Sequence, residues 1–147
     1  MLRLSTKARY ALRAMIELAM HEGEGLVQLR EVADAQQLSV KYLEQLTISL
    51  RHAGLVRAER GPQGGYELSR PPEEITALQV IQAVEGPLNL IDCIAQNGTC
   101  ARRSSCAAHG LWCRLNTAIG RVLSESTLAD LRQEQRALSE PLPSYQI

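Results

Sequence analysis

The stretch that decides the fold is SVKYLEQLTISLRHAGLVRAERGPQGGYELSR, residues 39–70. Ser39 is a typical helix N-cap and Gly54 a typical terminator, and the helical apolar spacing between them turns inward Val40, Leu43, Leu46 and Leu50. Two short runs suited to β-strands, residues 55–59 and 66–70, flank the sequence RGPQGG. We therefore predict a helix followed by a two-stranded hairpin, the layout of a recognition helix and its wing.

Two more helices are predicted before this stretch. Apolar residues at helical spacing cover residues 6–20 until HEGEG ends the run, and residues 29–36 form a short helix that ends in a turn at residues 37–38. Two short helices joined by a tight turn, after a longer helix, are typical of a helix-turn-helix. The outer face of the second short helix is then free to enter a DNA groove.

The chain after the hairpin is also predicted to be helical. Thr76 and Gln79 form a capping box for a short helix, a long helix with a wide apolar stripe covers residues 104–124, and a last helix covers residues 127–136. Such a stripe favours pairing with a second copy over packing within one domain. We predict a mainly α protein with a winged helix-turn-helix DNA-binding domain and two-stranded wing at residues 1–85, a loop at 86–110, a long dimerisation helix and a terminal helix within 104–136, and a flexible tail at 137–147.

Composition limits the classes of function. The 147 residues are 45% apolar, enough for one core, and their formal net charge is zero. No secretory leader and no apolar run of membrane-spanning length is evident, so we expect a cytoplasmic protein with no membrane association. No Ser/His/Asp arrangement, phosphate-binding glycine loop or paired-carboxylate site is evident either, so we expect no enzyme activity.

All four cysteines lie in CIAQNGTCARRSSCAAHGLWC, residues 93–113. Cys93, Cys100 and Cys106 are separated by six and five residues, and His109 follows three positions later. Thiols are kept reduced in the cytoplasm, so these donors favour a metal or redox centre over a disulfide staple. Zinc or an iron-sulfur cluster would suit the donor set. Structural zinc sites usually have closer cysteine pairs, and the wider gaps favour a multinuclear centre.

Four segments carry a resemblance to a known family: RLSTKARYALRAM, SVKYLEQLTISLRHAGLV, RGPQGGYEL and CAAHGLW, which begin at residues 3, 39, 60 and 106. They resemble the IscR-like members of the Rrf-two family of bacterial transcription factors, over residues 1 to 134. This resemblance implies a homodimeric regulator that binds a near-palindromic operator in double-stranded DNA and senses cluster, iron or redox status. It also implies a 2Fe-2S cluster held by Cys93, Cys100, Cys106 and His109.

The chain departs from the IscR-like pattern at two positions. The gap after Cys93 is one residue longer than in IscR, and Cys113 is an additional cysteine, expected to be a small buried hydrophobe on the dimer helix. Relatives that sense nitric oxide hold a 4Fe-4S cluster with a carboxylate from the first helix of the partner subunit, whereas this chain has Ala8 there. A nitric oxide or other redox sensor with that cluster, and a zinc-stabilised winged helix, are the alternatives.

The predicted DNA contacts fall into three groups. The start of the recognition helix and the wing are expected to contact the bases and the backbone of DNA. The basic N-terminal segment is expected to anchor DNA phosphates. A helix face exposed only to solvent would have the same charge pattern. His21 and His52 are expected to be surface or groove residues. The groups are Ser39, Lys41, Tyr42, Glu44 and Gln45 with Arg51 on the backbone; Arg60, Gly61 and Gly64 in the wing; and Arg3, Ser5, Lys7 and Arg9 at the N-terminus.

Overall fold

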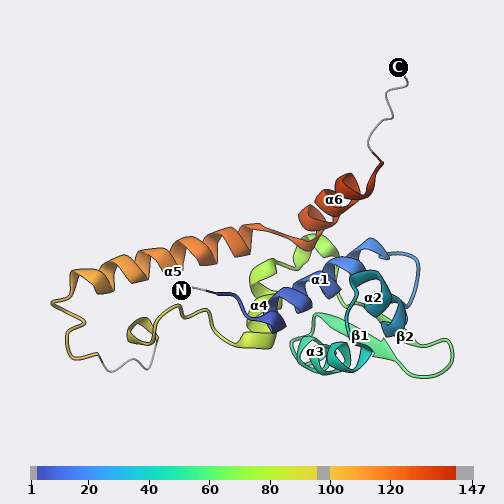
Figure 1. Ribbon diagram of the computed structural model, residues 1–147, viewed down its shortest axis with the longest axis horizontal. Coiled ribbons are helices and arrows are strands. Elements are labelled where there is room, and N and C mark those ends of the chain that lie inside the picture. Colours follow the sequence, from blue (N-terminus) through green and yellow to red (C-terminus); the bar gives the residue numbers. More distant parts are fainter. Residues whose placement is uncertain (1–2, 96–99, 142–147) are drawn as a thin grey trace, which may run out of the picture.

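The computed structural model describes residues 3–95 and 100–141, and it contains a winged-helix body from which one long helix extends (Figure 1). The mainly helical winged helix-turn-helix fold with a two-stranded wing is confirmed. The elements in chain order are α1 (Thr6–Met20), α2 (Leu29–Gln36), α3 (Val40–His52), β1 (Val56–Glu59), β2 (Gly65–Leu68), the 3-10 turn η1 (Pro72–Glu74), α4 (Ala77–Glu85), the 3-10 turn η2 (Asp92–Ile94), α5 (Ala107–Glu125) and α6 (Leu128–Ser139). Among the helices that the structure describes, none combines the length and apolar character needed to cross a membrane.

Helix α1 is the centre of the body and packs against α2, α3, α4 and α6. The Ser5 side chain caps it by accepting a hydrogen bond from the Ala8 amide at 3.0 Å. Most of the side chains on its buried face are small, so neighbouring helices can approach closely. The buried residues are Ala8, Ala11, Ala14, Met15, Leu18 and Ala19. Gln37, the C-cap of α2, has left-handed backbone angles and so starts the tight turn predicted at residues 37–38.

Helix α3 has the bounds expected from its caps, but its buried stripe differs from the prediction. Ser39 accepts a hydrogen bond from the Tyr42 amide, and Gly54 has the positive φ that ends a helix. Val40 was predicted to face inward and is 37% exposed, whereas Thr47 is 5% exposed. The stripe is centred on Leu43, Leu50 and Thr47, and at about 100° per residue Val40 lies at its edge.

The wing is an antiparallel hairpin in which Val56 pairs with Leu68 and Glu59 with Gly65. Its strands differ by one or two residues from the predicted ranges at each end except at Glu59. Gly61 has a φ of 111°, and a Cβ at Gly64 would overlap the Glu59 carbonyl group, so the tip requires glycine at both positions.

A third segment, which the sequence did not reveal, joins the hairpin. Val27, between α1 and α2, forms a bridge with Tyr66, with N–H···O distances of 2.9 and 2.7 Å. The wing is thereby tied to the helix-turn-helix.

The second half of the chain leaves the body and returns to it. Capping boxes begin α4, as predicted, and α6, and an isolated bridge joins Thr76 to Thr127 beside the fully buried Leu128. Helix α5 begins at Ala107, three residues later than predicted, because residues 101–105 form turns and Cys106 has extended backbone angles. Helix α6 ends three residues beyond the predicted end, and residues 142–147 of the predicted tail lie outside the described residues.

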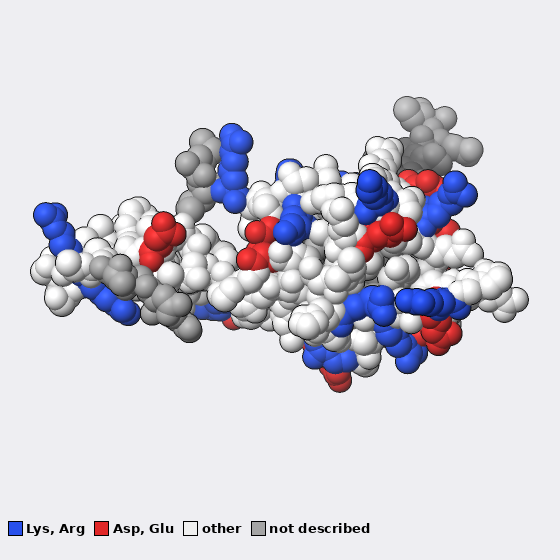
Figure 2. Space-filling model, turned by 90° about the horizontal axis from the view of Figure 1, so that it is seen from below, with Lys and Arg blue, Asp and Glu red and all other residues white. Residues whose placement is uncertain are grey.

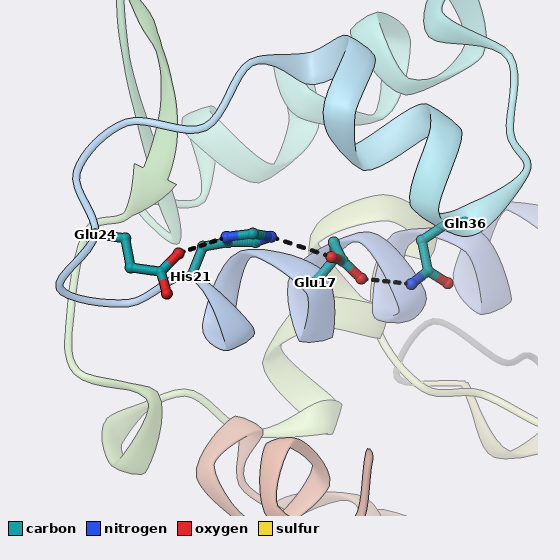
Figure 3. Close-up of polar contacts among 4 residues, drawn as sticks. All are labelled: Glu17, His21, Glu24 and Gln36. Carbon is teal, nitrogen blue, oxygen red and sulfur yellow. Dashed lines mark hydrogen bonds and ion pairs between the residues drawn. The ribbon is translucent and has the colours of Figure 1, made fainter. Parts of the chain in front are cut away.

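His21, the C-cap of α1, links two carboxylates (Figure 3). Its Nδ1 lies 2.8 Å from Glu24 and its Nε2 3.2 Å from Glu17, whose other oxygen accepts a hydrogen bond from Gln36 of α2 at 2.7 Å. The hydrogen bond to Glu24 raises the pKa of His21 above its ordinary value; partial burial opposes this increase and Glu17 adds to it. His21 is thus part of the α1–α2 contact, where the sequence predicted only a surface or groove residue.

We expect the stabilising effect of His21 to decrease as pH rises. Because its pKa is raised on folding, its contribution is full below about pH 6.5 and is lost as pH rises through the folded value. The His21→Gln substitution should therefore reduce the free energy of unfolding more at about pH 6 than at about pH 8. Urea unfolding of both proteins measures the two differences, and equal reductions would contradict this role.

Candidate nucleic-acid interface and metal site

Four exposed side chains, at positions 41, 44, 45 and 48, form the outward face of α3. Lys41, Glu44 and Gln45 were predicted contacts and are exposed, as is Ser39 at the N-cap. Ile48 follows on the same face at 66% exposure, although the sequence analysis did not select it. Its helical spacing from Lys41 and Glu44 was the signal that could have identified it. The face combines a base, an acid, an amide and an apolar group.

Tyr42 differs from the other predicted contacts of α3 because it is half-buried. Its ring meets the edge of Tyr10 with centroids 5.8 Å apart, and the Arg13 guanidinium lies 5.6 Å from the Tyr10 centroid. Arg13 also donates from Nε to the Gln36 side chain at 3.0 Å. Tyr42 therefore fixes α3 against α1, and only part of its ring is available to a ligand.

The remaining predicted contacts lie on the winged-helix body. The exposed ones are Arg51, Arg60, Gly61, Arg3, Ser5, Lys7 and Arg9, and Gly64 is half-buried. Figure 2 shows Lys and Arg side chains over the winged-helix part of one face, with carboxylates between them. The Ser5 hydroxyl donates to Glu85 while accepting from the Ala8 amide, so it is already engaged within the chain. The surface is mixed in charge, in agreement with the zero net charge.

The four cysteines are free thiols. The segments that carry them, η2, residues 100–106 and the first turns of α5, lie toward the end of α5 that points away from α6 (Figure 1). Cys93 lies in η2, which packs against α5, and Cys106 is the residue before the first turn of α5; both are half-buried, and Cys100 is exposed. Within residues 3–95 and 100–141, no three His, Cys, Asp or Glu side chains lie close enough to share a metal ion. The predicted ligands therefore remain a prediction.

His109, in the first turn of α5, has the ring environment of a potential ligand. Its Nδ1 is buried and has no hydrogen-bond partner among the described residues, and its Nε2 lies 3.5 Å from the Cys113 sulfur. A buried ring nitrogen without a partner is costly unless something binds it. Three thiols and this imidazole fit the donor set of an iron-sulfur cluster or of zinc. Cys113 was predicted to be a buried hydrophobe; it is half-buried and contacts His109.

The residue that holds the chain just before η2 was missed by the sequence analysis. Asn116 of α5 makes two hydrogen bonds to the backbone of Leu88 and Leu90. Asn116 interrupts the apolar stripe of the long helix, but this signal alone did not identify its partners.

Comparison with known proteins shows the family. The model of the Rrf2 family, described as "Iron-dependent Transcriptional regulator", matches residues 4–134. CymR, an HTH-type transcriptional regulator of Bacillus subtilis, is 42% identical over 130 residues, which are 88% of this chain and 89% of CymR. IscR of Aliivibrio salmonicida, also an HTH-type transcriptional regulator, is 40% identical over 130 residues, 88% of this chain and 77% of that protein.

Solved structures agree with this result. The structure of CymR, "the Global Cysteine Regulator of B. subtilis", superposes with a TM-score of 0.75 and covers 91% of this chain and 98% of its own. The structure of T. potens IscR, 37% identical, has a TM-score of 0.78 and covers 96% of this chain and 93% of its own. The chain thus belongs to the Rrf2 family of winged-helix transcriptional regulators, which bind DNA and are not enzymes.

Proposed function

We propose that this protein is a cytoplasmic, homodimeric, IscR-like regulator whose DNA binding depends on an iron-sulfur cluster, most simply 2Fe-2S, and reports cluster, iron or redox status. The observation that supports the proposal is the donor set itself: three free thiols, and His109 with a buried ring nitrogen that has no hydrogen-bond partner among the described residues. Cys93, Cys100, Cys106 and His109 would hold the cluster. The family description and the similarity to IscR agree with an iron-linked signal.

The chain's own residues suggest how such a site would act. A bound cluster would supply a link, sensitive to redox state and supply, between the segment that carries Cys93 and the first turn of α5. Without it, the segment that carries Cys93 is held against α5 by the contacts of η2 and by the Asn116 hydrogen bonds, two turns beyond His109. Any change in DNA preference would require the two forms to make different contacts with DNA.

The proposal of a homodimer rests on α5. None of its residues is buried in a single chain, and its apolar side chains include Leu111 at 47% exposure and Val122 at 64%. A second copy related by a twofold axis would cover such a face. The same axis would present two α3 helices to successive major grooves of a near-palindromic duplex. Sedimentation should give twice the mass of the chain.

The alternative 4Fe-4S type has less support. Its additional ligand would come from position 8 of the partner's α1, and Ala8 is 1% exposed within the core of its own chain. This position offers no donor and has no free surface. A zinc-stabilised winged helix uses the same thiols and is distinguished by metal analysis.

Glu44 and Lys7 should affect DNA binding differently. Glu44 is exposed on α3. A carboxylate there can accept a hydrogen bond from a cytosine amino group or repel the phosphate backbone of unsuitable sites. Glu44→Ala should therefore broaden the set of bound sequences. Lys7 is exposed at the start of α1, so Lys7→Ala should weaken all sites alike and lower the salt slope by about one per contact. Selection from random duplexes and titrations at several salt concentrations measure both effects. Equal losses with unchanged preference in both variants would contradict these roles.

The dependence of DNA binding on the cluster is tested with the duplexes obtained by selection with the wild-type protein. Cluster-loaded and cluster-free protein should rank them differently in a gel-shift titration. The same ranking for both forms would contradict a cluster-dependent regulator.

A further inference from the structure

Asn116 holds the linker segment, residues 86–91, against α5. Its Oδ1 accepts a hydrogen bond from the Leu90 amide at 3.3 Å, and its Nδ2 donates to the Leu88 carbonyl oxygen at 3.1 Å. One half-buried carboxamide therefore engages the backbone on both sides of Asn89. The two bonds thus fix both the position of the linker segment along α5 and the distance between the linker segment and α5.

The linker segment has few other restraints. Among the described residues, the two bonds to Asn116 are the only hydrogen bonds made by residues 87–90. Hollows of about 550 and 570 Å³ lie beside the segment, the first lined by Leu78, Asn116 and Gly120 and the second by Leu4, Ile119 and Leu123. Close apolar packing of a single chain thus does not determine the position of the linker, and the carboxamide provides its directional contacts.

Asn116 also links the two parts of the proposed metal site, the segment that carries Cys93 and the helix that carries His109. Asn116 follows His109 by seven residues, two helical turns, so both lie on the same face of α5. Leu90 precedes Cys93 by only three residues. Fixing Leu88 and Leu90 against α5 therefore fixes the position at which Cys93 enters the site relative to His109.

We propose that Asn116 is a positioning residue that sets the register of the Cys93 segment against α5 and so preorganises the metal site. This inference rests on the proposed function. Residues that orient metal ligands without touching the metal typically contribute 10- to 100-fold to metal affinity. We expect Asn116→Ala to lose its cluster about 10-fold faster than the wild type.

The hydrogen bonds are tested first in cluster-free protein. The Leu90 amide should exchange its hydrogen faster in Asn116→Ala than in the wild type, because its acceptor is removed. Asn116→Asp retains an acceptor for Leu90 but loses the donor to Leu88, so exchange at Leu90 should stay close to wild type. Ser124→Ala, an exposed polar residue of α5 that lines neither hollow, is the control and should change nothing. Unchanged exchange at Leu90 in Asn116→Ala would overturn the inference.

The cluster-loaded proteins give the second readout. Asn116→Ala should shift the electron paramagnetic resonance signature of the reduced cluster and shorten its half-life in air, and Asn116→Asp should have a smaller effect. Ser124→Ala should match the wild type. If Leu90 exchanges faster while signature and half-life are unchanged, Asn116 has a structural role only and the inference is wrong. Wild-type protein without iron would instead contradict the proposed function, and with it the role of Asn116 at a cluster.

Discussion

Anaerobically prepared Cys106→Ala protein is expected to be colourless and to contain no iron above background. Cys106 has an extended backbone immediately before α5 and is half-buried beside the turn that holds His109. Removing one of four ligands leaves too few donors to retain a cluster, so the expected loss is complete. Cys93→Ala and Cys100→Ala should give the same result. Iron analysis and the visible absorption spectrum measure it.

The fold should survive these substitutions. None of the cysteines is in the buried core, and Cys→Ala removes a single heavy atom, so we expect the free energy of unfolding to fall by no more than about 1 kcal/mol. Circular dichroism and sedimentation should therefore match the wild type. Cys113→Ala is the matched control, since Cys113 is also half-buried and lies seven residues after Cys106, and this protein should keep its colour. A colourless Cys113→Ala protein, or a coloured Cys106→Ala protein, would show that the ligand assignment is wrong.

His109→Cys is expected to produce a cluster with a lower reduction potential that persists longer in air. A thiolate adds a negative charge where the imidazole adds none, and clusters with histidine ligands have higher potentials than those with cysteine alone. We expect a decrease of roughly 100 mV or more. Potentiometric titration measures the decrease, and loss of visible absorbance in air measures persistence.

This substitution requires one precaution. A cysteine at position 109 would lie one helical turn from Cys113, whose sulfur is 3.5 Å from the present imidazole. The substitution is therefore made in Cys113→Ala protein, which is also the reference for both measurements. The resulting regulator should keep the DNA preference of its cluster-loaded form for longer. An unchanged potential and an unchanged rate of cluster loss would mean that His109 is not a ligand.

Local signals were sufficient to predict the winged-helix body. Ser39 and Gly54 fixed the bounds of α3, and the capping box of Thr76 with Gln79 fixed the start of α4. These signals act within a few residues, so they can be read from the sequence without knowledge of the remaining chain.

Features that depend on distant contacts could not be predicted in the same way. The pairing of Val27 with Tyr66 joins segments far apart in the sequence, and the exposure of Val40 depends on which helices cover α3. The late start of α5 reflects turns at residues 101–105, where no strong cap or breaker marks a boundary.

At the candidate site, too, some features could be predicted from the sequence and others could not. The clustering of Cys93, Cys100, Cys106 and His109 indicated that they suit zinc or an iron-sulfur cluster, and the resemblance to the IscR-like members implied that these four are the ligands. The contact of His109 with Cys113 was implicit in their separation by one helical turn. The Asn116 bonds were not, because a carboxamide can bind any backbone segment and only the fold brings residues 88 and 90 to it.

The proposed metal centre is a 2Fe-2S cluster held by the three thiols and His109. Its most direct test is the iron, sulfide and zinc content of wild-type protein purified without air, together with its absorption spectrum. We expect brown protein with about two irons and two sulfides per chain and no zinc. Colourless protein with one zinc per chain and no iron, or about four irons per chain, would contradict this assignment.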